Sequence, residues 1–230
     1  MDLPFTTEQF LGVFHAYNQA IWPAQIVAYL LGLTALALAF WKKPGSGRWV
    51  SGILGLFWIW MGAGYHLTFF SRVNPAAILF GVVFIVQGLL FLVAGVVKNR
   101  LRFEPRWTLS GLAGLLCIAY ALVIYPWLGA RLGHGYPQAP VFGVAPCPTA
   151  IFTFGLLLWA RRVPAWLLVV PVLWSLLGFS AALTLGIWED IGLLVAGVVA
   201  TAWILLRQRR ARIAVKLGEG GADDRASRCR

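Results

Sequence analysis

A cysteine held between two prolines is the residue of this sequence with the clearest capacity for chemistry. Pro146-Cys147-Pro148 interrupts an apolar stretch that runs from Val141 to Ala160. The thiolate form of cysteine is a nucleophile and a ligand for soft or borderline cations such as copper, zinc and mercury. The alternative is structural: Pro148 opens a helix, and Cys147 packs as a small hydrophobic residue.

The length of this stretch predicts where Cys147 lies. A helix from Pro148 to Ala160 has 13 residues, so it is about 20 Å long, whereas the hydrocarbon core of a bilayer is ~30 Å thick. The residues before it should therefore enter the membrane as irregular chain. Such backbone is tolerated only where protein or a water-filled cavity satisfies it. We expect Cys147 at the edge of a cavity.

Tyr65 and His66 form a second candidate site, near the end of another apolar stretch. An ionisable side chain inside a membrane span is costly and indicates a function. Together, His66 and Cys147 would suit a soft or borderline metal ion, so both are candidate metal ligands. The plain alternative is that His66 only hydrogen-bonds a neighbouring carbonyl group.

Other polar residues are predicted on the same side of the membrane. Gln25 lies one turn into the first apolar stretch, and Glu189 and Asp190 begin the last one. Acidic residues are favourable at a helix N-terminus, so this pair also has an ordinary explanation. The candidate ligand-binding residues are Gln25, Tyr65, His66, Cys147, Glu189 and Asp190.

Transmembrane helices are the elements that would position these residues. The chain of 230 residues is 60% hydrophobic and 12% charged, while soluble domains have about 25% charged residues. Its apolar residues fall in blocks long enough to span a bilayer. We predict an all-α, polytopic membrane protein with seven transmembrane helices, near residues 21–40, 50–70, 75–97, 109–129, 141–160, 164–186 and 188–206.

The basic residues predict the orientation of these helices. A net charge of +11 would suggest nucleic acid as the partner of a soluble protein, but here the Lys and Arg residues lie at the ends of apolar blocks. With seven spans, 17 of the 19 fall on one side, against Arg72 and Arg131 on the other. The positive-inside rule then places the N-terminus outside and the C-terminus in the cytoplasm. We expect the bacterial inner membrane, with the lipid bilayer and no nucleic acid as partner.

Both ends of the chain lie outside the transmembrane domain, which is predicted over residues 20–207. Residues 1–19 read as a short amphipathic helix in the membrane interface, with Thr6 and Gln9 spaced as a capping box. Asp2 and Glu8, without any basic residue, argue against a cleaved signal peptide. Residues 208–230 are basic and lack periodicity, so a disordered cytoplasmic tail is predicted.

The two halves of the chain show a weak internal similarity. The segment from Pro23 to Tyr29 resembles that from Pro148 to Phe154, and Trp60 to Tyr65 resembles Trp174 to Phe179. A real duplication would give a parallel repeat of three, one and three helices, which is the layout of the SWEET sugar transporters. Chance matching of helices rich in Leu, Gly and Val is the alternative.

Three stretches of the chain resemble an uncharacterised bacterial family of small integral membrane proteins, known only as a domain of unknown function. They are Pro4 to Gln25, Gly64 to Ala77 and Phe142 to Trp159, and the similarity covers most of residues 3–206. The resemblance implies a multi-pass membrane protein. It implies no activity and no functional residue.

Several cofactors and mechanisms are excluded or disfavoured by what the sequence lacks. All four lysines lie outside the predicted spans, so no retinal Schiff base can form. Only His66 of the three histidines lies within a span, which argues against bis-histidine haem. No acidic residue is placed at the middle of the membrane, which argues against a carboxylate proton relay. A phosphate loop and the usual hydrolase motifs are also absent.

The function predicted from these residues is transport of a small solute or a metal ion through a site in the outer half of the helix bundle. The alternative is a non-catalytic accessory or assembly subunit of a membrane complex, in which the same residues only pack helices. A membrane enzyme that uses the Cys147 thiol is a third reading, less favoured than a protein without catalysis. A homo-oligomer is compatible with the transport prediction.

Overall fold

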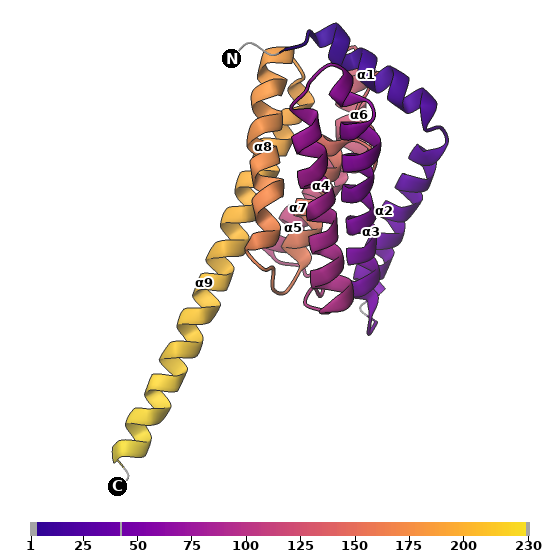
Figure 1. The fold of residues 1–230 in the computed structure, drawn as a ribbon. Helices are drawn as coiled ribbons and strands as arrows, with labels where there is room; N and C mark the ends of the chain where they lie inside the picture. Colours follow the sequence, from indigo (N-terminus) through magenta and orange to yellow (C-terminus); the bar gives the residue numbers. More distant parts are fainter. Residues whose placement is uncertain (1–3, 42, 229–230) are drawn as a thin grey trace.

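Helices account for nearly all of the computed structural model, which describes residues 4–41 and 43–228, with side chains up to residue 214 (Figure 1). Within these residues the chain forms nine α-helices: α1 (Thr7–Ala20), α2 (Ala24–Trp41), α3 (Ser46–Trp60), α4 (Ala77–Phe91), α5 (Leu109–Ala119), α6 (Tyr125–Arg131), α7 (Pro146–Trp159), α8 (Trp166–Leu185) and α9 (Ile191–Arg228). The predicted all-α fold is confirmed.

Short segments of other helical geometry continue or connect these helices. π-helical turns extend α3, α4 and α5: η1 (Met61–Leu67), η3 (Leu92–Val97) and η4 (Tyr120–Ile124). The 3-10 turns η2 (Phe70–Arg72) and η5 (Trp188–Asp190) precede the turn into α4 and the start of α9. π-helical turns inside α-helices are frequent at functional sites, and η1 carries both Tyr65 and His66.

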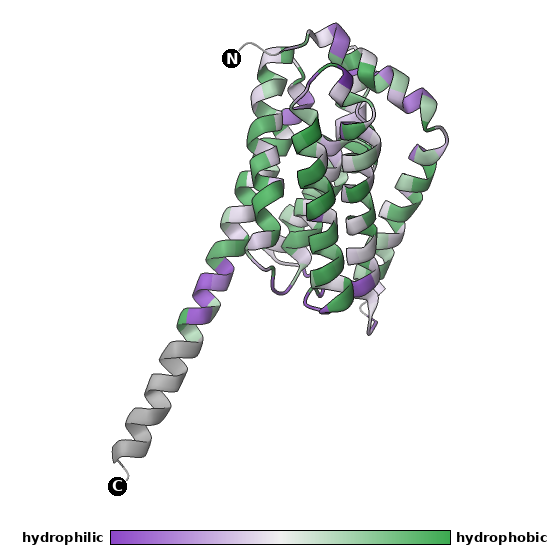
Figure 2. Ribbon diagram, in the orientation of Figure 1, coloured by the Kyte–Doolittle hydropathy of each residue, from purple (hydrophilic) through white to green (hydrophobic). Residues whose placement is uncertain are grey.

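Six helical stretches are long and apolar enough to cross a membrane among the residues described: 24–41, 46–72, 77–97, 109–131, 166–185 and 188–214. Their outward faces are hydrophobic along most of their length (Figure 2). Large apolar side chains such as Leu79 and Val123 are well over half exposed. A face of this kind is stable against lipid. The chain is therefore a multi-pass membrane protein by the length and composition of its helices.

The remaining predicted span, at residues 141–160, corresponds to the short helix α7. This helix has 14 residues, all of them buried. Proline at its first position favours a helix start there, because its missing N–H is not needed. The irregular chain before α7 is also largely buried, with Gly143 in the left-handed region at φ 79°. Thr149 satisfies this backbone, since its hydroxyl accepts from Gly143 N at 2.8 Å and donates to Ala145 O at 2.7 Å. The helix is short and follows irregular chain, as predicted, but it begins at Pro146 rather than Pro148, so Cys147 belongs to its first turn. Entry of the lead-in into the membrane stays a prediction.

Glycine residues set the distance between the main helix pairs. A Cβ atom built on Gly88 of α4 would lie 2.6 Å from the carbonyl oxygen of Gly55 in α3, and one on Gly62 would lie 2.6 Å from that of Gly81. Gly114 of α5 and Gly155 of α7 face each other in the same way. Small residues at such positions let the backbones of membrane helices approach closely, which is how packing energy is gained in lipid.

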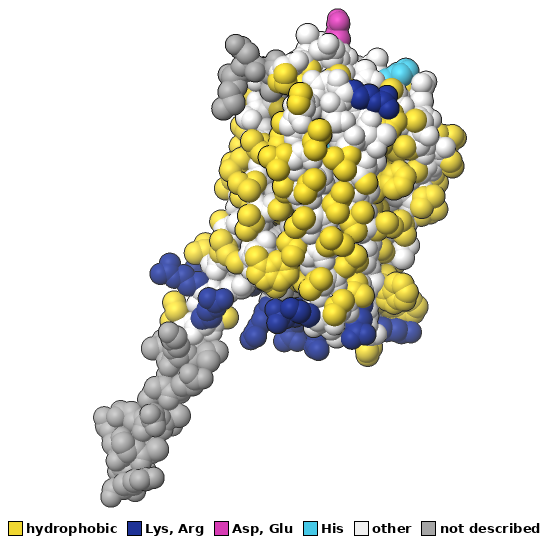
Figure 3. Space-filling model, in the orientation of Figure 1, with side chains coloured by type: hydrophobic (Ala, Val, Ile, Leu, Met, Phe, Trp, Pro, Cys, Tyr) yellow, Lys and Arg dark blue, Asp and Glu magenta, His cyan; other side chains and the backbone are white. Residues whose placement is uncertain are grey.

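The loops gather at two opposite ends of the bundle. At the basic end, defined by residues 43–45, 98–108 and 160–165, Arg161 N donates to Arg102 O at 2.9 Å, and Arg207 Nη2 donates to Ala160 O at 2.6 Å. Lys and Arg side chains crowd this end in Figure 3, below a wide band of hydrophobic side chains. The Lys and Arg residues thus gather at one end of the bundle, as the sequence predicts. The orientation of this end in a membrane stays a prediction.

Helix α1 lies across the opposite end, called the α1 end, together with η2, η5 and residues 132–145 (Figure 1). Its predicted capping box is present: Gln9 N donates to Thr6 Oγ1 at 3.2 Å, and Thr6 N donates to Gln9 Oε1 at 2.9 Å. Tyr17 then ties α1 to the lead-in of α7, because its hydroxyl donates to Val144 O at 2.9 Å.

Two further sequence predictions are not settled by this fold. In the first half α3 lies between α2 and α4, whereas in the second half α9 contacts both α7 and α8; the repeat of three helices stays a prediction. Helix α9 continues to Arg228, but the side chains of 215–230 and all of residues 229 and 230 lie outside the described residues. The predicted disordered tail therefore stays a prediction, as do the domain limits.

Candidate functional site

A cavity of about 170 Å³ lies beneath α1. Its wall combines the start of α7, the end of α8, η1, the start of α4 and the residues that lead into α9. Phe5, Phe10 and Phe14 close it on the α1 side. These rings are locked together with Phe70, since Phe5 and Phe70 are 5.3 Å apart and Phe10 and Phe14 are 5.1 Å apart between centroids. A packed aromatic layer therefore covers the cavity on this side.

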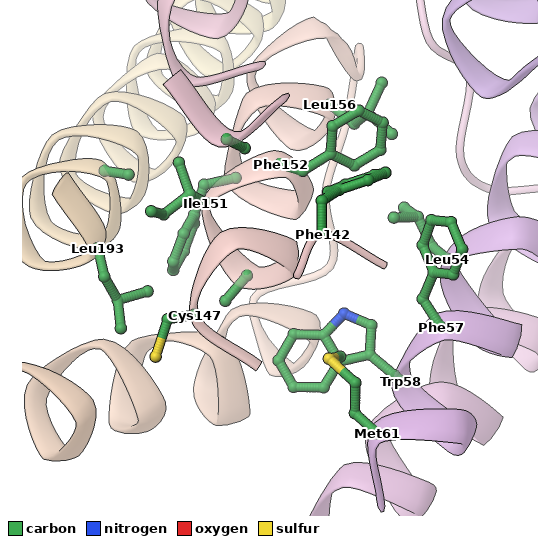
Figure 4. Packing of buried hydrophobic residues seen from close by; sticks show 14 of the residues in the cluster. Leu54, Phe57, Trp58, Met61, Phe142, Cys147, Ile151, Phe152, Leu156 and Leu193 are labelled. Carbon is green, nitrogen blue, oxygen red and sulfur yellow. The ribbon is translucent and has the colours of Figure 1, made fainter. Parts of the chain in front are cut away.

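The lining of the cavity is mostly apolar, and its polar residues include Cys147 of α7, Asp190 of η5 and Trp174 of α8, besides Tyr65, Asn74 and Ser180. The Cys147 thiol lies beside the Asp190 carboxyl and the Trp174 indole. Figure 4 shows Cys147 on the Leu193 side of α7, with Phe142 and Trp58 on the other side. Cys147 thus lines a cavity, while its role as a site residue stays a prediction.

Gly178 lies beside two of these groups and packs closely against α9. A Cβ atom built there would lie 2.9 Å from Leu193 Cδ2, 3.6 Å from Trp174 Nε1 and 3.8 Å from Cys147 Sγ. The Nε1 atom of Trp174 is buried and has no hydrogen-bond partner in the described part of the chain. Since buried indole N–H groups usually find a partner, this donor is free to bind a ligand in the cavity.

Asp190 is held from behind by Tyr125, whose hydroxyl donates to Asp190 Oδ1 at 2.6 Å. Both side chains are buried. The bond fixes the rotamer of Asp190, so that the carboxyl stays next to Cys147. Tyr125 was not foreseen as a site residue, because it stands 65 positions away in the sequence and belongs to no motif.

His66 lies just behind the cavity wall and is fully buried. Its ring is surrounded by Phe84 at 4.6 Å, Tyr65 at 5.0 Å and Trp174 at 5.2 Å between centroids, with Phe70 and Phe80 slightly further away. Neither Nδ1 nor Nε2 has a hydrogen-bond partner among the side chains and backbone described. The plain prediction that His66 bonds a neighbouring carbonyl is therefore wrong.

Tyr65 does line the cavity. Its ring stacks on Phe14 of α1 at 4.9 Å and on Phe70 at 5.5 Å. Together with the rings around His66, it forms an aromatic wall that continues the cover formed by α1. The placement of Tyr65 agrees with the predicted site.

Glu189 is fully buried, but it points away from this cavity towards residues 129–134. Its Oε1 atom is 3.3 Å from His134 Nδ1, and its backbone carbonyl accepts from the Tyr120 hydroxyl at 2.6 Å. The Oε2 atom has no partner among the described residues. Glu189 and Asp190 thus belong to one buried group of titratable side chains, on two sides of η5.

Gln25 is the predicted site residue that the structure places elsewhere. Its Nε2 atom donates to Asn18 O at 2.8 Å, and Asn18 Nδ2 donates to Pro137 O at 2.7 Å and Ala139 O at 2.8 Å. This network joins α1, α2 and the loop before α7. Gln25 therefore stabilises the corner on which α1 rests.

A metal centre at Cys147 and His66 gains no support from the geometry. Within residues 4–41 and 43–214, there is no group of three or more His, Cys, Asp and Glu side chains that could hold a metal ion. Aromatic rings enclose His66 on several sides, as described above. The predicted metal site stays untested, and the cavity is better suited to an organic molecule.

Helices of spanning length, an apolar belt and two polar ends define a multi-pass helical membrane protein. The profile of a family of unknown function, DUF6064, matches residues 7–215. The chain belongs to this family, and the resemblance expected from its sequence is confirmed. Neither the curated proteins nor the solved structures contain a match. The family brings no activity with it, so the function has to be inferred from the cavity.

Proposed function

We propose that this protein is a membrane carrier for a small, mostly apolar molecule that bears one hydrogen-bonding group, and that the cavity beneath α1 is its binding site. The cavity itself, with the unpartnered Trp174 Nε1 next to Cys147 and Asp190, is the observation that carries the proposal. Ligand sites are typically apolar with a few convergent polar groups.

The size of the cavity limits the ligand. An engineered cavity of about 150 Å³ lined by apolar side chains binds benzene, and the present one measures about 170 Å³. A single ring or a chain of a few carbons would fill it. Asp190 can accept a hydrogen bond or face a cation, and Trp174 can donate one.

The position of the cavity in the membrane depends on the number of crossings. Helix α7 begins just after Val144, which is bonded to Tyr17 of α1, and ends before Ala160, which is bonded to Arg207 at the basic end. We infer that α7 with its lead-in makes the seventh crossing. With the basic end in the cytoplasm, the cavity lies in the outer half, and α1 separates it from the outside.

Binding is tested with single-ring molecules on the purified protein in lipid nanodiscs. We expect benzyl alcohol and benzylamine to raise the thermal unfolding temperature, because each has an apolar ring and a group that can donate to Asp190. The hydroxyl of benzyl alcohol can also accept from Trp174 Nε1. Gly178→Leu should abolish this shift, since its side chain would fill the space between Trp174 and Cys147. Val169→Leu, at an exposed position of the same helix, is the control and should respond as the wild type does.

The outcome decides between the candidate functions. Equal shifts in Gly178→Leu and wild type would show that the compounds do not bind in the cavity. Binding without flux of labelled benzylamine into proteoliposomes would reject the carrier. Purification with a stable stoichiometric partner, and without ligand binding, would instead favour the accessory subunit.

A further inference from the structure

Two neighbouring carboxyl groups are buried at the α1 end without a basic side chain to neutralise them. The side chain of Glu189 is 0% exposed and that of Asp190 is buried as well. No Lys or Arg lies within ion-pair distance of either carboxyl in the described part of the chain. The titratable groups that face the pair are Tyr120 of η4, Tyr125 of α6, His134 of the following loop, Cys147 of α7 and Tyr65 of η1.

Both residues precede α9, where the helix dipole favours a negative charge, but hydrogen-bonded helix capping does not account for their contacts. Among the residues described, neither carboxyl accepts a hydrogen bond from a backbone N–H group. Asp190 accepts from Tyr125, and Glu189 contacts His134. A capping side chain would accept from the N–H groups of the first helical turn. The pair is therefore held by groups that can themselves carry a proton.

Two adjacent negative charges in this setting would be strongly unfavourable. Burial of an ionised carboxyl costs several kcal/mol unless the charge is paired, and two carboxyls that share a site cannot both ionise easily. The Tyr125 hydroxyl stabilises a negative charge at Asp190. Glu189 Oε2 has no partner among the described residues, and Glu189 Oε1 contacts the imidazole of His134. One proton kept among these groups therefore avoids two adjacent unpaired negative charges.

His134 connects this proton to the surface. Its side chain is 14% exposed, and its Nδ1 atom lies 3.3 Å from Glu189 Oε1. Gly129 leaves room for that contact, because a Cβ atom there would lie 3.2 Å from the same oxygen. An imidazole can take a proton from water and release it near neutral pH.

We propose that Glu189 and Asp190 hold one exchangeable proton, that His134 delivers it from the α1 end, and that binding in the cavity is linked to it. In the transfer, the Nδ1–H bond of protonated His134 breaks and an Oε1–H bond forms on Glu189, which leaves a neutral imidazole. With Glu189 neutral, Asp190 can be ionised where it faces Cys147 and the cavity. The exchange of the proton stands by itself; its link to a ligand rests on the proposed function.

Infrared spectroscopy of the full-length protein in nanodiscs tests the exchange without any ligand. We expect a carbonyl stretching band from a protonated carboxyl at neutral pH, which is lost in Glu189→Gln and in Asp190→Asn. In heavy water the band should shift as deuterium enters, and in His134→Gln this shift should be at least tenfold slower at an unchanged band position. A merely structural role of His134 would leave the exchange rate as it is.

A control variant distinguishes the buried pair from other carboxyl groups of the protein. Glu8→Gln removes an exposed carboxyl of α1 and should change neither the band nor its exchange rate. A wild-type spectrum without the band, or a band that survives both substitutions of the pair, would overturn the proposal. If a pair variant does not fold, the exchange rate in His134→Gln still decides, since the pair is intact there.

The link to the cavity has a separate readout. Calorimetric titration with benzylamine in buffers of different ionisation enthalpy gives the number of protons released on binding. We expect about one in the wild type, because the cation favours an ionised pair, and none in Glu189→Gln. Binding without proton release would overturn the link. Absence of binding would reject the proposed ligand class and, with it, the link, while the infrared result would still stand.

Discussion

His66 is a polar residue buried in an apolar environment. Both ring nitrogens are buried without a hydrogen-bond partner, and the neighbours are aromatic rings. Leaving a buried polar group unpaired costs about 1–3 kcal/mol. An ordinary core position would carry Leu or Phe. Burial of this imidazole therefore lowers the stability of the fold, and other contacts offset the loss. Its position in the π-helical turn η1, next to the cavity wall, favours a role in the site.

Replacement of this imidazole should stabilise the protein. We expect His66→Leu to raise the free energy of unfolding by about 1–2 kcal/mol, because it removes two unpaired polar atoms at nearly constant volume. Unfolding in mixed micelles measures the change. His15→Leu, at a half-buried position of α1, is the control and should stay within ~0.5 kcal/mol. A clear loss of stability in His66→Leu would contradict this and would mean that the imidazole has a bound partner.

Asn18 and Gln25 are also buried polar residues, but they form hydrogen bonds. Their amide nitrogens donate hydrogen bonds that join α1, α2 and the loop before α7. Both residues are polar and lie in an apolar context, so in the sequence Gln25 looks like a ligand-binding residue. The direction of its amide group, which only the fold reveals, makes it a structural residue.

At the scale of elements, the bundle depends on close backbone contacts. The pair α3 and α4 meets at Gly55 and Gly88, and the continuation of α3 meets α4 at Gly62 and Gly81. These four residues recur every seven positions along each helix, which is two turns, so they form one line of contact. The aromatic wall of the site lies next to this line, because Tyr65 and His66 follow Gly62 by three and four residues, about one helical turn.

A methyl group on that line should separate the two helices. We expect Gly88→Ala to cost about 1–3 kcal/mol, as overpacking usually does, since its Cβ atom would lie 2.6 Å from Gly55 O. Gly52→Ala is the matched control: its Cβ atom would meet only Val96 at 3.9 Å, so it should be neutral or slightly stabilising. Unfolding of both variants in micelles checks this. Equal effects of the two would show that the contact is not tight.

At the scale of the whole molecule, two ends of different character are separated by an apolar belt (Figure 3). The cavity and the buried carboxyl pair lie near the α1 end, whereas the basic loops lie at the other. Membrane insertion places basic loops in the cytoplasm. The proposed carrier would thus meet its ligand and its proton on the outer side.

Labelling of single cysteines tests this orientation. In a variant without the native cysteines, we expect a membrane-impermeant maleimide to label Gln138→Cys in intact spheroplasts, because Gln138 is exposed at the α1 end. Pro44→Cys, exposed at the basic end, should react only after permeabilisation. The reverse pattern would invert the proposed topology and place the cavity in the cytoplasmic half.

The sequence by itself determined the class of this protein and much of its layout. Blocks of about 20 apolar residues are typical of membrane spans, and the capping box at Thr6 and a short helix that begins with a proline beside Cys147 follow from local rules of helix geometry. Such features depend on neighbours in the chain, so they can be read from it.

Only the tertiary structure decided which polar residues share a site. Cys147, Asp190, Trp174 and Tyr125 come from different helices, and their meeting depends on how glycine contacts and the short α7 set the helix positions. In the structure, Glu189 is buried beside His134, and Gln25 bonds Asn18 away from the cavity. The direction of these side chains cannot be predicted from the spacing of residues along the sequence, because it follows from packing between segments far apart in the chain.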